Sequence, residues 1–396
     1  MSGLLAAALL RRVGWEVDVF ERSSVELVGR GAGITVHPEL LDVLELSGAG
    51  TRDLGVEVDR RIVIDERGRV IAERPLRQIL TSWDRLQTLL RDREPAGRYH
   101  LGHTFTAAEQ DGRGVTVRFV GGRSERADLL IGGDGFRSSV RAQVAPEAQP
   151  VYVGYLVWRG APAEASLSAA TRATIHPYFT FFLPPRQQVI GYPIAGLHNE
   201  LRPGRRRYNF IWYRVVDADQ LRDMCTDAEG RHHEFTIPPP LIRDDVIAEM
   251  RATAERTMAP PFLDALRQIA RPFFTPIYDL VSPRMVFGRI VLIGDAASVA
   301  RPHMGYGVSK AAEDARALAE ALAAHGDDIA AALAGFEGLR QPIGERVVEH
   351  ARMLGTHLAV DLRTEEDRVT SKALQDPEAM MRHIAVPHFL TAPRPG

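Results

Sequence analysis

The feature that most constrains the fold is one segment in the last third of the chain, residues 288–316. It opens with an apolar, β-branched run at 290–293, which is typical of a strand buried on both faces. Gly294 and Asp295 follow directly, so we expect a carboxylate at the carboxyl end of that strand. Open α/β sheets bind their ligands at this edge. The segment therefore predicts an α/β fold with a ligand site beside Asp295.

The same segment continues into a turn and the start of a helix. Arg301-Pro302 interrupts the backbone, and Gly305 and Gly307 permit close approach before a helix rich in Ala and Leu. The free N–H groups at a helix start favour an electron-rich group in front of them. Strand, acid, proline turn and glycine-rich helix start together predict a cofactor site.

The first 22 residues read as the second half of a dinucleotide-binding βαβ unit. Residues 3–13 predict a helix, and residues 16–20 predict a strand that ends at Glu21. In such units an acid about 20 residues beyond the glycine fingerprint binds the ribose, and Glu21 lies 18 residues after Gly3. The strand and first glycines that should precede Gly3 are absent, so we expect Met1 to be an internal methionine of a longer native protein.

Composition limits the class of protein. With 396 residues, of which 45% are hydrophobic, the chain can form two or three domains with sizeable cores. A net charge of −2 gives no general attraction to nucleic acid or to an anionic membrane. The single cysteine, Cys225, excludes an internal disulfide and a cysteine-based metal site, and fits a reducing cytoplasm. The apolar stretch at 4–10 is too short to span a bilayer, which needs about 20 residues.

Three motifs, far apart but in the right order, carry a resemblance to a known family. They are Met-Ser-Gly with the distal Glu21-Arg22, the run Asp-Leu-Leu-Ile-Gly-Gly-Asp-Gly-Phe-Arg-Ser-Ser-Val-Arg at 128–141, and the segment from 288 to 318. Together they resemble the FAD-dependent aromatic hydroxylases of the para-hydroxybenzoate hydroxylase type, the group A flavin monooxygenases. The resemblance covers nearly the whole chain. Three shorter runs, at 154–160, 209–213 and 301–303, are most similar to the dihydroxypyridine monooxygenases of this family.

The resemblance implies an α/β fold and its division into parts. We expect a Rossmann-like FAD-binding domain (three-layer ββα) with its first strand missing, an inserted mixed β-sheet substrate domain, and C-terminal helices. Residues 151–283 have all-β patterning with many aromatic residues. The expected boundaries are 1–56, 84–150 and 284–335 for the FAD-binding domain, 57–83 and 151–283 for the β-rich substrate domain, and 336–396 for a C-terminal helical segment and tail.

The resemblance also implies residue roles around FAD. Ser2 and Gly3 would meet the pyrophosphate at the start of the first helix, and Glu21 would hold the adenosine ribose. Asp295 would bond the ribityl chain, and residues 305–308 would present backbone N–H groups to the pyrimidine edge of the flavin. The full set of expected cofactor-binding residues is Ser2, Gly3, Glu21, Arg22, Gly33, Arg85, Asp134, Gly135, Gly294, Asp295, Pro302, Gly305, Gly307 and Val308.

The implied reaction is hydroxylation of an electron-rich ring with NADH or NADPH and O₂, through a flavin C4a-hydroperoxide. In such enzymes the cofactor carries the difficult chemistry, while the protein supplies orientation, electrostatics and dryness. Deprotonating a ring hydroxyl makes the ring carbon more nucleophilic, and a histidine suits that task. His303 follows the proline of the turn that should face the flavin, so it is the candidate catalytic base. It could equally cap the turn through hydrogen bonds.

Other conspicuous residues have simpler structural explanations. Trp212 and Tyr213 are neighbours on a predicted strand and point to opposite faces, so at most one of them can line a pocket. Lys310 is expected to be a solvated helix residue or a partner of Glu313 or Asp314. His37 is expected to be structural. The His-His-Glu run at 232–234 lacks further spaced ligands, so we expect no metal site.

The leading hypothesis is a cytoplasmic FAD- and NAD(P)H-dependent monooxygenase that acts on a hydroxylated aromatic or N-heteroaromatic ring, such as a hydroxypyridine. Its partners would be that ring, O₂ and NAD(P)H, without nucleic acid or membrane; homodimer formation stays open. One alternative is an N-terminally truncated, inactive homologue that binds no FAD. Another is a flavin oxidase or epoxidase that acts on a non-aromatic substrate.

Overall fold

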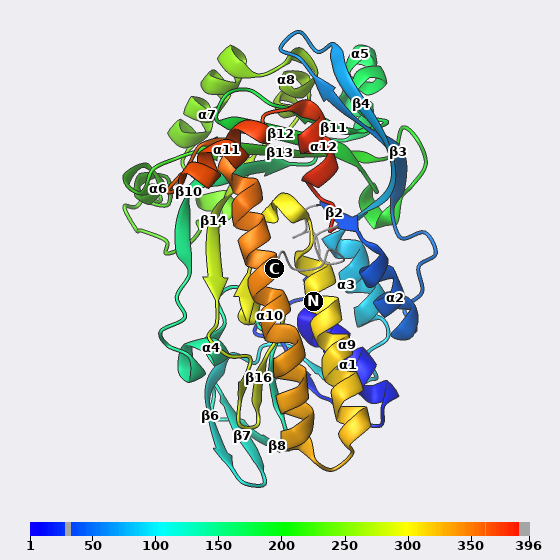
Figure 1. The fold of residues 1–396 in the computed structure, drawn as a ribbon, viewed down its shortest axis with the longest axis vertical. Helices are drawn as coiled ribbons and strands as arrows, with labels where there is room; N and C mark the ends of the chain where they lie inside the picture. Colours follow the sequence, from blue (N-terminus) through cyan, green and yellow to red (C-terminus); the bar gives the residue numbers. More distant parts are fainter. Residues whose placement is uncertain (28–32, 361, 388–396) are drawn as a thin grey trace.

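A large mixed sheet forms the upper part of the computed structural model, which describes residues 1–27, 33–360 and 362–387 (Figure 1). Within these residues it has nine strands in the order β17-β14-β10-β13-β12-β11-β3-β4-β2. Neighbouring strands are antiparallel except β11 and β3. The strands are β2 Gly33–Val36, β3 Val56–Ile64, β4 Val70–Ser82, β10 Val151–Gly160, β11 Phe179–Phe182, β12 Gln187–Ile194, β13 Arg207–Val215, β14 Phe273–Val281 and β17 Ser298–Val299.

The two faces of this sheet are both buried, against different partners. On the outer face Trp158 and Trp212 lie opposite each other in register and pack with helices α7 (Asp244–Thr257) and α8 (Pro260–Arg267). On the inner face Tyr155 and Tyr213 pack with the C-terminal helices. The prediction that Trp212 and Tyr213 point to opposite faces is confirmed, because alternate side chains of a strand leave opposite sides of a sheet.

Helices cover the outer face, where the all-β patterning of residues 151–283 predicted none. They are α5 Ala169–Thr174, α6 Ala218–Met224, α7 Asp244–Thr257 and α8 Pro260–Arg267 (Figure 1). In α7 the buried residues Val246, Met250 and Ala254 recur every four positions, which is a helical period. The prolines that open α8 occupy its first turn, where a missing N–H is tolerated. The all-β expectation for this segment was therefore wrong.

Three small sheets form the lower part of the molecule. The predicted strand at 290–293 is confirmed as β16, which pairs in parallel with β9. Two strands of the segments expected to bind the cofactor, β2 and β17, instead pair at the two ends of the large sheet. The small sheets contain β1 Val19–Phe20 with β5 Tyr99–His100, β15 Val286–Phe287 with β16 Ile290–Leu292 and β9 Leu130–Gly132, and β6 Phe105–Asp111 with β7 Gly114–Phe119 and β8 Ser124–Ala127.

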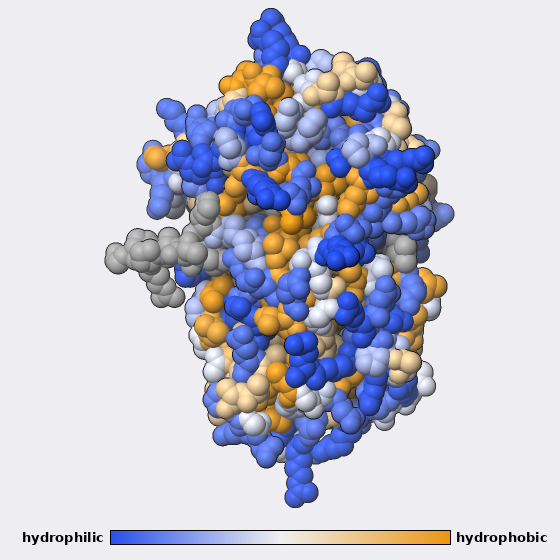
Figure 2. All heavy atoms as spheres, turned by 90° about the vertical axis from the view of Figure 1, so that its right-hand side faces the viewer, coloured by the Kyte–Doolittle hydropathy of each residue, from blue (hydrophilic) through white to orange (hydrophobic). Residues whose placement is uncertain are grey.

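Long helices join the two parts of the molecule. Helices α9 and α10 run side by side, and α1 packs against α9 (Figure 1). The remaining elements are α1 Ser2–Arg12, α2 Pro38–Leu46, α3 Trp83–Arg91, α4 Ser139–Val144, α9 Gly307–His325, α10 Ile329–Gly355, α11 Glu365–Ala373 and α12 Pro377–His383. None of the described helices is both long and apolar enough to cross a membrane. On the face seen in Figure 2, hydrophilic residues cover most of the surface, and apolar residues gather in a band along its middle.

Candidate active site

Three glycine-containing motifs that are far apart in the sequence meet at the start of α1. A side chain on Gly133 would lie 2.9 Å from the Gly3 nitrogen, and one on Gly294 would collide with the Ser2 hydroxyl. Gly294 also has a φ of +60°, a conformation that favours glycine. These two close contacts explain why glycine is needed at Gly133 and Gly294. The structure therefore brings together the motifs that the sequence singled out.

Side chains of α9 hold the Gly294 peptide on both sides. Lys310 Nζ donates to the Gly294 carbonyl at 2.8 Å, and Asp314 Oδ2 accepts from the Gly294 N–H at 2.9 Å. Lys310 is buried and lies 3.6 Å from Asp314, whose other oxygen accepts from Arg340 at 2.8 Å. The pairing with Asp314 is confirmed, and the solvated alternative for Lys310 was wrong. This clamp fixes the turn that carries Asp295.

The Asp295 carboxyl lies in a low-dielectric environment. Burial raises its pKa, and the nearby Lys310 ammonium and Arg141 act in the opposite direction. A polyhydroxy ligand could bond to this carboxyl in its neutral or its charged form.

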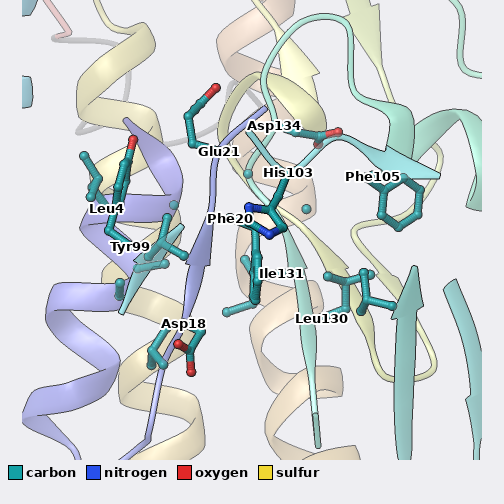
Figure 3. Close-up of a pocket in the computed structure, with 18 of the residues that line it drawn as sticks. Leu4, Asp18, Phe20, Glu21, Tyr99, His103, Phe105, Leu130, Ile131 and Asp134 are labelled. Carbon is teal, nitrogen blue, oxygen red and sulfur yellow. The ribbon is translucent and has the colours of Figure 1, made fainter. Parts of the chain in front are cut away.

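A cavity of about 590 Å³ opens below this meeting point, between two sheet edges (Figure 3). Strand β1 pairs with β5, and β9 pairs with β16; neither has a second ladder among the described strands. Apolar side chains line the space between them: Leu4, Phe20, Tyr99, Leu130 and Ile131. The expectation of an additional first strand stays a prediction.

Two predicted acids lie at one end of the cavity, beyond the carboxyl ends of β1 and β9 (Figure 3). Glu21 accepts from the Ser23 N–H at 2.9 Å, and Arg22 lines the cavity beside it. Asp134 instead caps α4, accepting from the Ser139 N–H at 2.7 Å and from the Ser138 hydroxyl. Its carboxylate therefore has a structural role, next to Gly135, whose φ is +80°.

Arg85 is directed away from this cavity. Its Nη2 donates to the Arg52 carbonyl at 3.1 Å, whereas the residues of its helix that line the cavity are Trp83 and Gln87. A role of Arg85 at the cofactor stays a prediction. Nothing in its present contacts directs it to the glycine motifs.

Gly33 and His37 lie at the two ends of β2, next to the large sheet. The Gly33 N–H donates to Asn209 Oδ1 at 3.2 Å, and a side chain there would collide with Tyr192 and Asn209. His37 is buried and its Nδ1 lies 3.1 Å from the Ser309 hydroxyl in α9. Gly33 thus packs within the large sheet, and His37 joins this sheet to the start of α9.

His303 lies in the turn Pro302–Met304 and is fully enclosed, with 1% of its surface exposed. Its Nε2 lies 2.8 Å from the Tyr155 hydroxyl, and its ring stacks on Tyr213 with centroids 4.8 Å apart. The ring of His357 stands edge-on, at 5.1 Å and 86°. Burial lowers the pKa of His303 well below its ordinary value, and the nearby His357 and Arg301 act in the same direction. His303 is therefore neutral at pH 7.

A buried ion pair between Arg301 and Asp279 lies next to Tyr155, the hydrogen-bond partner of His303. Arg301 donates to both oxygens of Asp279, at 3.2, 3.1 and 2.9 Å, and Arg352 donates to the same carboxylate at 3.0 Å. Arg301 also contacts the Tyr155 hydroxyl. No pattern in the sequence pointed to Asp279 or His357, while Tyr155 falls within the run at 154–160 that carried the family resemblance.

Arg61 is a buried cation that the sequence analysis did not single out. Its guanidinium donates to Gln78 Oε1 and to the carbonyls of Met381, Ile384 and Ala385. Burial lowers its pKa to about 9. Ala385 in turn donates its N–H to the His303 carbonyl at 2.8 Å. Arg61 thus fixes the C-terminal segment against the His303 turn.

Buried histidines predict how stability depends on pH. Burial lowers the pKa of His37, His176, His350 and His357 to about 4. Between pH 6.5 and 4 the unfolded chain binds protons at these sites and the folded chain does not. We therefore expect the free energy of unfolding to decrease as the pH is lowered through this range. The decrease is up to about 1.4 kcal/mol per pH unit for each histidine. Urea unfolding at pH 5, 6, 7 and 8 measures this, and constant stability down to pH 5 would contradict it.

Among the described residues no group of three or more His, Cys, Asp or Glu is placed to hold a metal ion.

Gly3 and Gly307, at the starts of α1 and α9, face open space, since an added side-chain carbon would have no neighbour within 4 Å. Two helix starts with accessible backbone fit an extended, electron-rich ligand that passes close to the main chain.

Comparison with known proteins gives a consistent result. A family model described as FAD binding domain-like matches residues 152–279. The chain is 31% identical to 2,6-dihydroxypyridine 3-monooxygenase of Paenarthrobacter nicotinovorans, over 90% of this chain and 89% of that protein. It is also 31% identical to 3-amino-4-hydroxybenzoate 2-monooxygenase of Streptomyces cremeus, over 95% and 91%. The solved structure of 2,6-dihydroxypyridine-3-hydroxylase from Arthrobacter nicotinovorans superimposes with a TM-score of 0.84 and 31% identity, over 90% of both chains.

Proposed function

Because this chain belongs to the FAD-dependent aromatic monooxygenases, we propose that it hydroxylates a hydroxypyridine-like ring with NAD(P)H and O₂. The observation that carries this proposal is the convergence of the glycine motifs at Gly3, Gly133 and Gly294 with Asp295, on the α9 side of the buried His303 turn. One of the relatives above is named for a dihydroxypyridine. The runs around Tyr155 and His303 are those that resemble the dihydroxypyridine monooxygenases.

The residues present fit FAD. Ser2 and Gly3 would hold the pyrophosphate at the start of α1, where backbone N–H groups and the helix dipole favour an anion. Glu21, at the end of β1, would hold the adenosine ribose. Asp295 would bond the ribityl chain, and residues 305–308 would meet the flavin ring. FAD bound there supplies electron transfer from NAD(P)H to O₂ and delivery of one oxygen atom to the ring.

The protein's own side chains would orient the aromatic substrate and exclude water. Tyr155 and Tyr213 form an aromatic wall on the inner face of the large sheet, and both are almost fully buried. His303 stands against this wall, where it can meet a ring hydroxyl. Arg61 would hold the C-terminal segment over the turn, which keeps the site dry.

The test uses the purified chain and added FAD. We expect the yellow spectrum of a bound flavin, and NAD(P)H oxidation that a hydroxypyridine stimulates more than a hydroxybenzoate does. A colourless protein that gains no flavin would contradict the proposal and favour an inactive homologue. Steady NAD(P)H oxidation that no ring affects would favour an oxidase.

Replacing His303 by Gln is expected to slow hydroxylation about 10²-fold while flavin reduction changes little, because the side chain acts on the ring and not on the flavin. Rapid-mixing absorbance separates the two steps. His176→Gln is the matched control, since His176 is equally buried but packs against Tyr208, whose ring lies on the outer face. Equal hydroxylation rates in the parent and His303→Gln would remove His303 from the reaction.

We propose further that the protein works in the cytoplasm. Its single cysteine, Cys225, is buried and cannot form an internal disulfide, which fits a reducing compartment.

A homodimer is the proposed assembly, and light scattering at several protein concentrations tests it. A mass equal to one chain at all concentrations would contradict the dimer.

A further inference from the structure

Two neighbouring buried histidines each have one nitrogen without a hydrogen-bond partner among the described residues. These atoms are Nδ1 of His303 and Nε2 of His357, whose rings are 5.1 Å apart. The side chains are enclosed, with 1% and 5% of each residue exposed. Buried polar atoms in folded proteins almost always have a partner. Two unpaired nitrogens on adjacent rings therefore point to a ligand that supplies the missing bonds.

The bond to Tyr155 sets which nitrogen of His303 carries the proton. The Arg301 guanidinium contacts the Tyr155 oxygen and can only donate, so that oxygen accepts from Arg301. The Tyr155 hydroxyl is then free to donate to His303 Nε2 at 2.8 Å, which leaves the proton on Nδ1. The reverse direction would leave both the Tyr155 O–H and His303 Nδ1 unsatisfied. The arrangement with one unsatisfied atom is favoured over the arrangement with two.

A backbone carbonyl sets the proton of His357 in the same way. Nδ1 of His357 lies 2.6 Å from the Leu354 carbonyl, which can only accept. Nδ1 therefore carries the proton, and Nε2 keeps an unshared electron pair. Burial lowers the pKa of His357 to about 4, so this nitrogen is free to accept at neutral pH.

We propose that the Nδ1–H of His303 and the Nε2 of His357 form a donor–acceptor pair that binds one ring hydroxyl of the substrate. His303 donates to the hydroxyl oxygen, and His357 accepts the hydroxyl hydrogen. The pair selects a ring that bears a free hydroxyl over the same ring with a methoxy group. Tyr155 is a positioning residue, because it acts through the tautomer of His303. This inference rests on the proposed function, and it replaces a single base by two histidines with separate roles.

The first test reads the tautomers directly. In protein labelled with ¹⁵N-histidine, two-bond ¹H–¹⁵N spectra distinguish a protonated from an unprotonated ring nitrogen, and His303→Gln and His357→Gln assign the two signals. We expect both rings to carry the proton on Nδ1, and Tyr155→Phe to shift the His303 pattern. Tyr213→Phe is the control, since it keeps the stacked ring and leaves the Tyr155 hydroxyl in place. A proton on Nε2 of His303 would overturn the pair.

The second test measures selectivity in the FAD-loaded protein. Flavin absorbance gives the dissociation constants of a hydroxypyridine and of its methoxy analogue. His357→Asn keeps an N–H group that reaches the Leu354 carbonyl but leaves no acceptor at the position of His357 Nε2. We therefore expect the preference for the hydroxyl over the methoxy analogue to fall about 3- to 10-fold. His357→Gln restores an acceptor near the Nε2 position and should recover most of the preference.

The two tests separate the possible failures. Unchanged selectivity in His357→Asn, with normal ring binding, would overturn the pair and leave the proposed function intact. Failure of all rings to bind the parent protein, with both tautomers as expected, would overturn the proposed function and the pair with it.

Discussion

Replacing Gly294 by alanine is expected to weaken FAD binding strongly. The residue has a φ of +60°, and an added methyl group would collide with the Ser2 hydroxyl and lie 3.2 Å from the Ala311 side chain. Because α1 and α9 both pack here, neither can move away without opening the core. Strain and overpacking together should lower the free energy of unfolding by about 2–4 kcal/mol. The FAD dissociation constant should rise about tenfold or more, since the turn that holds Asp295 is displaced.

Fluorescence titration with FAD and urea unfolding measure these two effects. The matched control is Gly338→Ala, an exposed position in α10 where an added methyl group meets nothing within 4 Å. That change should raise stability by about 0.5–1 kcal/mol, because alanine is the better helix former. Normal FAD binding by Gly294→Ala would contradict the proposed place of Asp295 at the cofactor.

Replacing Asp279 by asparagine is expected to destabilise the protein by about 3–5 kcal/mol. Asp279 is 5% exposed and neutralises two arginines, Arg301 and Arg352. The asparagine has nearly the same shape, so the loss comes from a cation left buried without its counter-ion. Because Arg301 contacts Tyr155, the change should also disturb the bond between Tyr155 and His303.

Urea unfolding at pH 7.5 measures the loss. Glu57→Gln is the control, since Glu57 pairs with Arg77 at 2.7 Å on the surface, with half or more of each side chain exposed. Exposed pairs contribute about 0–1 kcal/mol. Similar losses in the two variants would show that the Asp279 pair is not a buried centre of stability.

Local patterns predicted several elements of this protein correctly. The strand at 290–293 followed from a β-branched run, and the opposite faces of Trp212 and Tyr213 followed from the two-residue period of a strand. The glycine motifs marked places where two main chains approach closely, and these motifs indeed meet. Such features depend on residues that are near in sequence or on a shape that only glycine permits.

Long-range pairs between ordinary residue types escaped prediction. Tyr155 and His303 are 148 residues apart, and Arg61 binds carbonyls more than 300 residues away. The burial of Lys310 depends on the Gly294 peptide and Arg340, which a helical pattern alone does not reveal. The helix α7 was missed because strong β patterns on both sides of it dominated the reading of residues 151–283.

Isotope transfer from labelled oxygen tests the central claim most directly. The FAD-loaded protein is supplied with NAD(P)H, a hydroxypyridine and ¹⁸O₂, and the product ring is examined by mass spectrometry. We predict one added oxygen atom that carries the ¹⁸O label, formed in step with NAD(P)H oxidation. Oxidation of NAD(P)H that yields only hydrogen peroxide, with each ring tested left unchanged, would contradict a monooxygenase.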